Sequence, residues 1–257
     1  MNLSVIIITK NEAANIAECI ASASFAKEII IVDSGSTDET LSIALNLGAK
    51  VFKTDWQGFG FQKNRAIDFS TGDWIFSLDA DERIPINLKN EIQQAITQTE
   101  FDVFDVPRQS LFISKFIQYS GWYPDRTKRL FKRDSARFSA HQVHEHLDTN
   151  NKVGHLNTAL VHYSYRDYET LINKMNLYST AGALDFNQRG KKSSLSKAIA
   201  HGTWAFIRTY FINLGFLDGS AGLILAIANA ETTYYKYIKL IFLQSRTDVK
   251  HPTNPLV

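Results

Sequence analysis

Two short stretches decide the fold, Leu3-Ser-Val-Ile-Ile-Ile8 and Glu28-Ile-Ile-Ile-Val-Asp33. Both are rich in β-branched residues and show no polar alternation, which is typical of strands buried on both faces of a sheet. Residues 12–23, which lie between them, have few β-branched side chains and scattered apolar positions, as a crossover helix would. The two stretches therefore predict a strand, a helix and a second, parallel strand.

The same alternation continues along the first hundred residues. Ser36 and Thr37 can cap a helix that Gly48 ends. Further strands are expected at residues 50–53 and 73–78, and further helices at residues 63–69 and 88–96. This order predicts an α/β fold with a mixed, mainly parallel sheet flanked by helices.

The pattern changes in the second half of the chain. Residues 102–106, 129–132 and 158–165 predict strands separated by long loops, and residues 167–246 predict helices broken near Gly190 and between Gly215 and Gly222. We therefore expect an α/β domain over residues 1–165 and a C-terminal helical extension over residues 166–257.

Bulk composition narrows the function only a little. The 257 residues are 44% hydrophobic, enough for a substantial core, and a net charge of +2 from 28 basic and 26 acidic residues gives no case for nucleic-acid binding. Cys19 is the only cysteine, which excludes an intrachain disulfide and any cysteine-built metal centre within one chain. That usage fits a reducing cytoplasm.

Neither apolar end segment has the features of a membrane span or a leader. No basic flank precedes the stretch Leu3 to Ile8 and no small-residue cleavage site follows it, so we expect no secretory signal. The stretch Gly222 to Ala230 is strongly apolar, but Asp218 and Glu231 bound it well short of the ~20 residues that a spanning helix needs.

Polar loops follow the first, second and fourth predicted strands: Thr9-Lys10-Asn11-Glu12, Asp33-Ser-Gly-Ser-Thr-Asp38 and Asp79-Ala-Asp81-Glu82. Carboxyl ends of parallel strands are where α/β folds bind nucleotides. Asp33 can accept hydrogen bonds from a base or a ribose, and Gly35 permits a tight turn. Asp79 and Asp81 are two residues apart, so in an extended segment both can reach one divalent cation.

This set of loops fits the release of a nucleoside diphosphate. Such a leaving group builds up negative charge, which Mg²⁺ or Mn²⁺ held by carboxylate oxygens offsets. One Asp-x-Asp motif is a weak signal, because carboxylates are common in turns. Three polar loops at matching strand ends are much more specific. Gly58 and Gly60 lack the third glycine and the preceding strand of a dinucleotide fingerprint, which disfavours a Rossmann dehydrogenase.

Over residues 1–100 the three motifs together resemble the family-2 glycosyltransferases, which have the GT-A fold and usually invert the sugar in one displacement. The resemblance implies that Thr9, Asn11, Glu12 and Asp33 contact the nucleoside, usually uridine. It also implies that Asp79 serves the ribose or the metal and that Asp81 binds the metal.

One motif departs from the family pattern. Lys63-Asn64-Arg65-Ala66 stands where many relatives have Ala-Arg-Asn-x-Gly, so either Lys63 or Arg65 can be the cation that faces the donor.

A narrower resemblance is to the bacterial lipopolysaccharide core glucosyltransferases that modify the inner-core Kdo sugar. It rests on Asp55-Trp-Gln-Gly-Phe-Gly-Phe-Gln-Lys-Asn64, Asp125-Arg-Thr-Lys-Arg-Leu-Phe-Lys-Arg133, Val143-His-Glu-His-Leu147 and Phe216-Leu-Asp-Gly219. It implies a metal-dependent hexosyltransferase that moves glucose from UDP-glucose to an inner-core sugar of a lipopolysaccharide precursor. The same chemistry on a polyprenyl phosphate or a protein, and a non-catalytic nucleotide-sugar binder, remain as alternatives.

Two carboxylates are candidates for the general base that inversion requires at the acceptor hydroxyl. Asp125 lies in an aromatic-rich loop before a predicted strand, and Glu145 lies in a histidine-rich segment. The position of Asp125 in the chain order favours it, because the acceptor-side acid of the broader family falls there. An exposed or ion-paired carboxylate without catalytic function is the plain alternative for either.

Three histidines, His141, His144 and His146, fall within six residues. His144 and His146 share a face if the segment is extended, so either can be a further metal ligand. Cations that prefer oxygen rarely take several imidazoles, so at most one is expected on the metal.

Two later segments bear on the acceptor. Six of the twelve residues 126–137 are basic, which suits an anionic acceptor or a charged, solvated strand edge. Residues 197–239 interleave aromatic side chains with Lys and Arg, which suits a membrane interface or ordinary core helices. We expect a lipid-linked saccharide acceptor, an anionic membrane surface as partner and a peripheral location at the cytoplasmic, inner face of the bacterial cell membrane.

Overall fold

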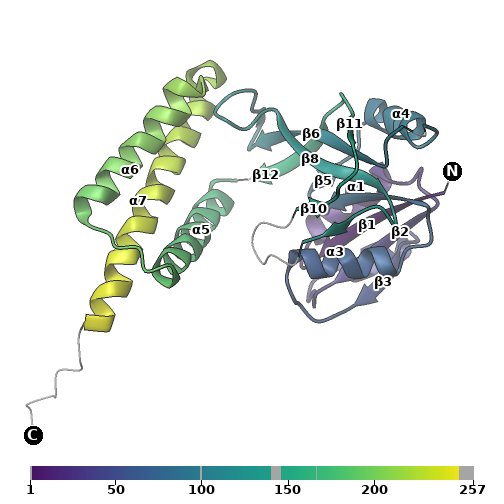
Figure 1. The fold of residues 1–257 in the computed structure, drawn as a ribbon, viewed down its shortest axis with the longest axis horizontal. Coiled ribbons are helices and arrows are strands. Elements are labelled where there is room, and N and C mark those ends of the chain that lie inside the picture. Colours follow the sequence, from purple (N-terminus) through teal and green to yellow (C-terminus); the bar gives the residue numbers. More distant parts are fainter. Residues whose placement is uncertain (1, 99, 140–145, 166, 249–257) are drawn as a thin grey trace, which may run out of the picture. The chain divides into compact units, whose positions relative to one another are not determined.

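The computed structural model describes residues 2–98, 100–139, 146–165 and 167–248 (Figure 1). The chain divides into two compact units, Met1–Ser110 with Pro124–Ser164 and Leu111–Tyr123 with Tyr165–Val257. We call them the first unit and the second unit. Residues 111–123 therefore belong with the C-terminal helices although 41 residues, 124–164, separate the two segments in sequence.

A mixed sheet forms the centre of the first unit. Its parallel half contains β1 (Leu3–Thr9), β2 (Glu28–Asp33), β3 (Lys50–Lys53) and β4 (Trp74–Asp79). The remaining strands on the main path are β8 (Asp125–Lys132), β6 (Val103–Phe112), β12 (Leu160–Tyr165) and β5 (Glu82–Arg83). The strand order is β3-β2-β1-β4-β8-β6-β12-β5, with β8 antiparallel to both of its neighbours. The predicted α/β class with a mainly parallel sheet is confirmed.

Three short strands complete the described part of this unit. β11 (Val153–His155) runs parallel to β6, and β9 (Arg137–Phe138) and β10 (Leu147–Asp148) form a separate antiparallel pair.

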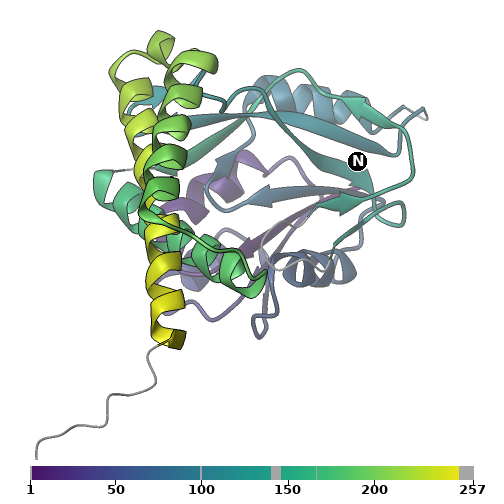
Figure 2. The same cartoon turned by 60° about the vertical axis from the view of Figure 1, so that its left-hand side comes forward.

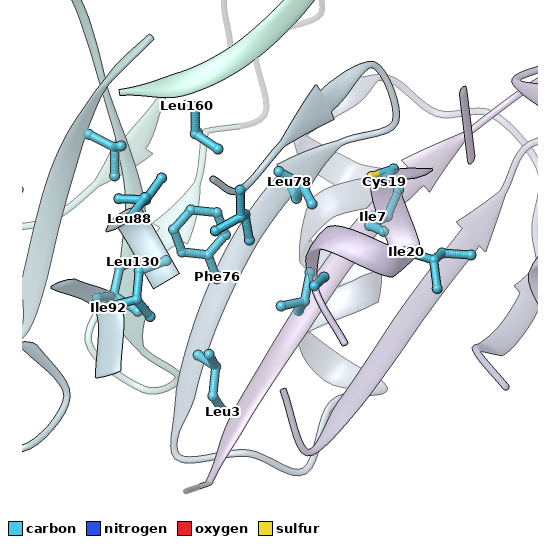
Figure 3. Close-up of a cluster of buried hydrophobic side chains, with 14 of the residues drawn as sticks. Leu3, Ile7, Cys19, Ile20, Phe76, Leu78, Leu88, Ile92, Leu130 and Leu160 are labelled. Carbon is cyan, nitrogen blue, oxygen red and sulfur yellow. The ribbon is translucent and has the colours of Figure 1, made fainter. Parts of the chain in front are cut away.

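Helices cover both faces of the sheet because alternate side chains of β1 point to opposite faces. Leu3, Val5 and Ile7 pack on one face with buried residues of α1 (Ala13–Ser22), α2 (Thr40–Asn46) and α4 (Ile86–Ala95). Ile6 packs on the other face with Ala66 and Ile67 of α3 (Phe59–Asp68). Strands buried on both faces explain the uninterrupted apolar runs of the sequence. Figure 3 shows the larger cluster, in which Cys19 and Ile20 of α1 and Leu88 and Ile92 of α4 flank Phe76 and Leu78 of β4.

Three predictions about element ends were wrong. The helix α3 begins at Phe59, a full turn before residue 63. The strand β8 begins at Asp125, so this residue lies on a strand and not in the loop before it. Ser36 and Thr37 do not cap α2, which begins only at Thr40; the Asp38 carboxylate instead accepts the backbone N–H of Thr40 at 3.0 Å.

The second unit is helical, as predicted, and its helices break where the glycines indicated. It contains α5 (Tyr168–Gln188), α6 (Leu195–Ile207), the π-helical turn η1 (Arg208–Ile212), the 3₁₀ turn η2 (Gly215–Asp218) and α7 (Ser220–Asp248). Gly190 has a φ of 67° directly after the cap of α5, the left-handed position that glycine favours at helix ends. Asp167 and Ser194 cap α5 and α6 by accepting backbone N–H groups of the first turn.

The helices α6 and α7 form an antiparallel hairpin that turns at η1 and η2 (Figures 1 and 2). Gly202 of α6 permits the close approach, since a Cβ there would lie 3.2 Å from the Ala230 carbonyl oxygen of α7. No described helix combines the length and the apolar character that crossing a bilayer requires.

Asp218 ties residues 111–123 to the turn of this hairpin. Its buried carboxylate accepts the backbone N–H groups of Gln118 at 3.0 Å and Tyr119 at 3.1 Å, and the Ser120 hydroxyl at 2.8 Å. Lys115, on the short strand β7 (Lys115–Phe116), donates its Nζ to the Asp218 carbonyl oxygen at 2.6 Å. This carboxylate is therefore satisfied mainly by backbone donors of one loop.

Candidate functional site

The three polar loops that follow β1, β2 and β4 lie at one edge of the sheet. β1 is hydrogen-bonded to β2 on one side and β4 on the other, with Thr9 opposite Asp33 and Ile8 opposite Asp79. The parallel register therefore brings together residues that are up to 71 positions apart in sequence. The loops meet where an α/β fold places a nucleotide.

Hydrogen bonds connect the first two loops. Asn11 has a φ of 56°, its Oδ1 accepts the Thr37 N–H at 2.8 Å, and its own N–H donates to the Ser36 hydroxyl at 2.9 Å. Glu12, the residue before α1, donates its N–H to Thr40 Oγ1 at 2.8 Å and accepts the Asn15 side chain at 2.6 Å. Asn11 and Glu12 thus hold the loop frame together.

Asp33 and Thr9 lie deeper at the same edge. Asp33 is fully buried, and its Oδ1 accepts the N–H groups of Gly35 at 2.9 Å and Ser36 at 3.0 Å, in a turn where Gly35 has a φ of 95°. The Thr9 hydroxyl is buried and has no hydrogen-bond partner within the described protein. A buried hydroxyl in that state is suited to a ligand or an ordered water as its partner.

The structure separates the two cations of the Lys63-Asn64-Arg65 motif. Lys63 is 5% exposed, with its Nζ 3.2 Å from Asp79 Oδ1 and over the ring of Phe138. Arg65 pairs with Asp55 at 2.8 Å and donates to the Asp55 carbonyl oxygen, on the loop before α3. Lys63 is therefore the cation of this motif that lies beside Asp79.

Asp79 belongs to a buried charge network. Arg129 of β8 donates to Asp79 Oδ2 and to Glu82 Oε1, both at 2.6 Å, and Glu82 also accepts the Asp79 N–H at 3.0 Å. Burial alone would raise the pKa of Asp79, but Arg129 and Lys63 hold it well below its usual range. Burial raises the pKa of Glu82, against the opposing pull of Arg129. Through Arg129, the network holds the loop between β4 and β5 against β8.

Asp81 faces a histidine that lies 81 residues away in sequence. His162 Nε2 is 3.2 Å from Asp81 Oδ2, and both side chains are partly exposed. The pairing of β12 with β5, in which His162 lies opposite Glu82, produces this contact. The hydroxyls of Ser110 and Ser164 lie 3.0 Å and 2.8 Å from the other ring nitrogen, Nδ1, and so orient the imidazole.

These two side chains form a small candidate metal site. Among the described residues no three His, Cys, Asp or Glu side chains are grouped to hold an ion. One carboxylate and one imidazole can still bind a divalent cation whose other ligands are phosphate oxygens and water, which is how cations of this kind are held beside nucleotides. The pair Asp81–His162 therefore fits a cation that arrives with a diphosphate.

Asp125 lies at the start of β8 and is held by Arg108 of β6. Arg108 Nε donates to Asp125 Oδ2 at 2.9 Å, its Nη2 contacts the same oxygen, and its Nη1 is 3.6 Å from Glu82 Oε1. The Asp125 side chain is 41% exposed. Arg108 thus links a partly exposed carboxylate to the buried network.

A cavity of about 420 Å³ opens beside Asp79. Half of its ten lining residues are lysines or arginines, and the lining comprises Lys63, Asp79, Arg108, Arg126, Thr127, Lys128, Arg129, Phe138, His146 and Leu147. His146 Nε2 pairs with Asp148 at 2.8 Å, and its Nδ1 lies 3.2 Å from the Ser139 hydroxyl. His141, His144 and Glu145 lie outside the described residues.

Four members of this site were not predicted from the sequence: Glu82, Arg108, Arg129 and His162. Arg129 falls in residues 126–137, where a solvated strand edge was one of two interpretations, and that one is wrong for Arg129, which is 4% exposed. Period-two alternation offered one signal, because Arg129 has the same strand parity as Phe131, a core residue. No local signal joins His162 to Asp81, since only strand pairing does so.

A parallel half-sheet with three polar loops, extended by antiparallel strands, is the GT-A fold of glycosyltransferases. The profile of Glycosyl transferase family 2 matches residues 4–142, more than half of the chain. The chain belongs to this family, which confirms the resemblance seen in its motifs.

Sequence relatives cover nearly the whole chain. An uncharacterized glycosyltransferase of Rickettsia prowazekii is 32% identical over 93% of this chain and 86% of its own length. An uncharacterized glycosyltransferase of Rickettsia felis is 33% identical over 93% of this chain and 89% of its own length. The lipopolysaccharide core biosynthesis glycosyltransferase LpsC of Rhizobium meliloti is 30% identical over 91% of this chain and 93% of its own length.

Solved structures give more distant matches. S. aureus TarS 1–349 is 15% identical with a TM-score of 0.49, over 98% of this chain and 93% of that chain. Glucosyl-3-phosphoglycerate synthase from Mycobacterium tuberculosis, in complex with Mn²⁺ and UDP, is 27% identical with a TM-score of 0.36. That match covers 42% of this chain and 43%, less than half, of that chain.

Proposed function

We propose that this family-2 enzyme transfers a hexose, with glucose as the first candidate, from a UDP-sugar to an inner-core sugar of a lipopolysaccharide precursor, with inversion. The observation that carries the proposal is the meeting of the three polar loops at the ends of β2, β1 and β4. LpsC, whose name gives lipopolysaccharide core biosynthesis, aligns over 91% of the chain and supports the acceptor class.

We assign the nucleoside to the edge formed by Thr9, Asn11, Glu12 and Asp33. The buried Thr9 hydroxyl without a protein partner supports a ligand there. Lys63 and Arg129 would hold the anionic part of the donor near Asp79. A phosphate that shares these cations with Asp79 and Glu82 would leave every buried charge with a partner. Arg65, which pairs with Asp55, would instead hold the loop before α3 in place.

We assign a divalent cation, Mg²⁺ or Mn²⁺, to Asp81 and His162. Asp79, the other predicted carboxylate, is paired with Lys63 and Arg129. When bound there, the cation would offset the negative charge that develops on the leaving diphosphate. The 3.2 Å contact between Asp81 and His162 supports this pair over His146, which faces Asp148. His144, the other predicted ligand, lies outside the described residues.

We assign the general base to Asp125. It is partly exposed beside the cavity that Arg108 and Arg129 line, where an acceptor hydroxyl can approach. Arg108 orients the carboxylate, and Glu82 behind it offsets part of the cation's charge. Glu145 stays the second candidate.

The acceptor side extends the proposal to the membrane. We propose that residues 1–165 carry donor binding and catalysis and that residues 166–257 face the lipid-linked acceptor, at the cytoplasmic face of the bacterial cell membrane. The five lysines and arginines against one carboxylate in the cavity lining support an anionic acceptor sugar or phosphate. A polyprenyl phosphate or protein acceptor would use the same donor site.

The test is a comparison of glycolipid masses from cells with and without the gene, with donor hydrolysis by the purified protein measured in parallel. The proposal predicts loss of one hexose from the lipopolysaccharide core and hydrolysis of UDP-glucose that requires Mg²⁺ or Mn²⁺. An unchanged core with a hexose lost from polyprenyl phosphate or protein would move the acceptor. Donor binding without hydrolysis or transfer would support a non-catalytic binder.

A further inference from the structure

The turn of the α6–α7 hairpin exposes a concentrated apolar surface. We call this surface the hairpin tip and define it by eight side chains that are each between 37% and 56% exposed: Trp204, Ile207, Phe211, Ile212, Leu214, Phe216, Leu217 and Leu223. Phe116 and Tyr119, on the segment that Asp218 ties to this turn, add 40% and 39% exposed rings. Such a cluster is much larger than the scattered apolar residues of an ordinary surface.

Charge is distributed unevenly along the same hairpin. Residues 190–230 contain one acid, Asp218, which is buried, and four cations, of which Lys191, Lys192 and Lys197 are exposed at the start of α6. The Lys191 carbonyl oxygen accepts the side chain of Gln244 near the far end of α7, which places these lysines at the opposite end of the hairpin from the tip. The hairpin therefore has an apolar end and a cationic end.

The length of the apolar part limits how it can bind. From Lys197 to Ile207 the helix rises about 15 Å at ~1.5 Å per residue. That is half of the ~30 Å hydrocarbon core of a bilayer, so the tip can enter one leaflet and cannot cross both. Lys197 would then lie at the level of the head groups, where anionic lipids attract it. Lys191 and Lys192 lie farther out, because Gln244, which contacts Lys191, is 24 residues or about 36 Å along α7 from Ser220.

Two details of the tip support lipid over water as its surroundings. Leu214 has a φ of 56°, which glycine or asparagine would adopt at a lower steric cost, and yet its apolar side chain is 43% exposed. Arg208, an exposed cation beside the tip, has a long stem that lets its guanidinium reach the interface. Between α6 and α7 a groove of about 540 Å³, which Phe206 and Ile227 line together with Glu231, extends this surface away from the turn.

We infer that the hairpin tip inserts end-on into one leaflet of an anionic lipid bilayer, while Lys197 contacts the head groups. This goes beyond a helix lying flat on the surface, because the apolar side chains gather at an end of the hairpin. The inference rests on the proposed function only for its purpose, which is delivery of the site to a lipid-linked acceptor.

Co-sedimentation with vesicles tests the inference without donor or acceptor. The tip variant is Ile212→Ser with Leu214→Asn and Leu217→Ser, three side chains that belong to none of the buried clusters. We expect wild-type protein to bind phosphatidylethanolamine–phosphatidylglycerol vesicles and the tip variant to bind at least about tenfold more weakly. The matched control, Leu45→Ser with Leu47→Ser and Ile86→Ser, removes side chains that are 58%, 48% and 64% exposed in the first unit and should bind like wild type.

Depth and charge have separate readouts. Brominated lipids should quench Trp204 fluorescence, and Trp204→Phe should remove that quenching while vesicle binding persists. Lys197→Gln should weaken binding to anionic vesicles by about fivefold and leave binding to phosphatidylcholine vesicles unchanged. Lys191→Gln with Lys192→Gln should weaken binding less, because these two lysines lie farther from the bilayer.

Three results would overturn the inference. They are no vesicle binding by wild-type protein, equal vesicle binding by wild type and the tip variant, or a dimer that wild-type protein forms and the tip variant does not. The last would identify a second copy of the chain as the partner of the tip. UDP-glucose hydrolysis is measured on the same samples. Failure of hydrolysis in wild-type protein with normal vesicle binding would count against the proposed function alone.

Discussion

The two units treat charge and apolar surface in opposite ways. The first unit joins the buried Glu82 and Arg129 to the partly exposed Asp79 in one network at the ends of its strands, whereas the second unit exposes eight large apolar side chains around a turn with one buried carboxylate. Buried charge is costly unless it is paired, and exposed apolar surface is costly unless it is covered. In each unit the unfavourable feature, buried charge in the first and exposed apolar surface in the second, lies where we propose that a ligand binds.

Glu82 and Asp218 make the same contrast on the scale of one side chain. Glu82 shares Arg129 with Asp79 and lies near Arg108, so its partners are cations that also line the cavity. Asp218 is satisfied by two backbone N–H groups and a hydroxyl of residues 118–120. Cations can exchange a carboxylate for a substrate anion, whereas a loop that donates backbone N–H groups is fixed, so the first arrangement suits binding and the second suits architecture.

The largest effect is expected at Asp81. Asp81→Ala should lower UDP-sugar turnover by about 1000-fold, because the proposed cation supplies several kcal/mol of charge stabilisation. Hydrolysis of UDP-glucose at saturating Mn²⁺ measures it, with the melting temperature as a check on folding. Asp134→Ala, which removes a carboxylate that is 87% exposed, is the control. Full activity of Asp81→Ala would end the metal assignment and leave the first unit with a purely structural network.

Glu82 is expected to matter most for the stability of the first unit. Glu82→Gln removes one charge from a buried network and should lower the free energy of unfolding by about 3 kcal/mol. Denaturant unfolding measures the loss. Glu18→Gln removes the 75% exposed partner of Arg83 and should cost less than about 1 kcal/mol. Equal effects of the two substitutions would show that burial of the network has no energetic consequence.

Asp218 provides the corresponding test in the second unit. In Asp218→Asn one acceptor oxygen becomes an NH₂ group that faces backbone donors, which should cost about 2 kcal/mol. Hydrogen exchange at the amides of Gln118 and Tyr119 should quicken, while UDP-glucose hydrolysis by the first unit stays at the wild-type rate. A large loss of hydrolysis would mean that the two units are coupled more closely than their separate networks indicate.

The smallest effect is expected at Glu28, far from the site loops. Its carboxylate accepts from Ser4, Thr71 and Lys50, and although burial opposes the shift these partners lower its pKa from 4.5 to about 2. Because the folded pKa is the lower one, Glu28 contributes its full stabilisation above pH 4.5 and loses it as the pH falls toward 2. Glu28→Gln should cost about 1.5 kcal/mol at pH 7.

Denaturant unfolding at several pH values measures this contribution. The difference between wild type and Glu28→Gln should shrink steadily below pH 4.5. Glu39→Gln changes an exposed glutamate and serves as the isosteric control. A difference that is constant down to pH 2 would contradict the low pKa.

Much of the first unit could be predicted because its signals are local. The apolar runs of β1, β2 and β4 reflect strands buried on both faces, and the polar residues that follow each run mark the strand ends. Gly190 marks the end of α5 because glycine adopts the left-handed conformation without a steric cost. Such features depend on neighbours in the chain, so the amino-acid sequence alone determined the fold class, the family and the positions of the three polar loops.

Tertiary structure alone decided which distant side chains meet. His162 reaches Asp81 because β12 pairs with β5, Arg129 joins Asp79 to Glu82 because β8 lies against β4, and Arg108 reaches Asp125 because β6 lies against β8. The gathering of apolar side chains at the turn of α6 and α7 depends equally on how the hairpin closes. Strand register and helix packing are set by the total burial of the chain, which no local pattern contains.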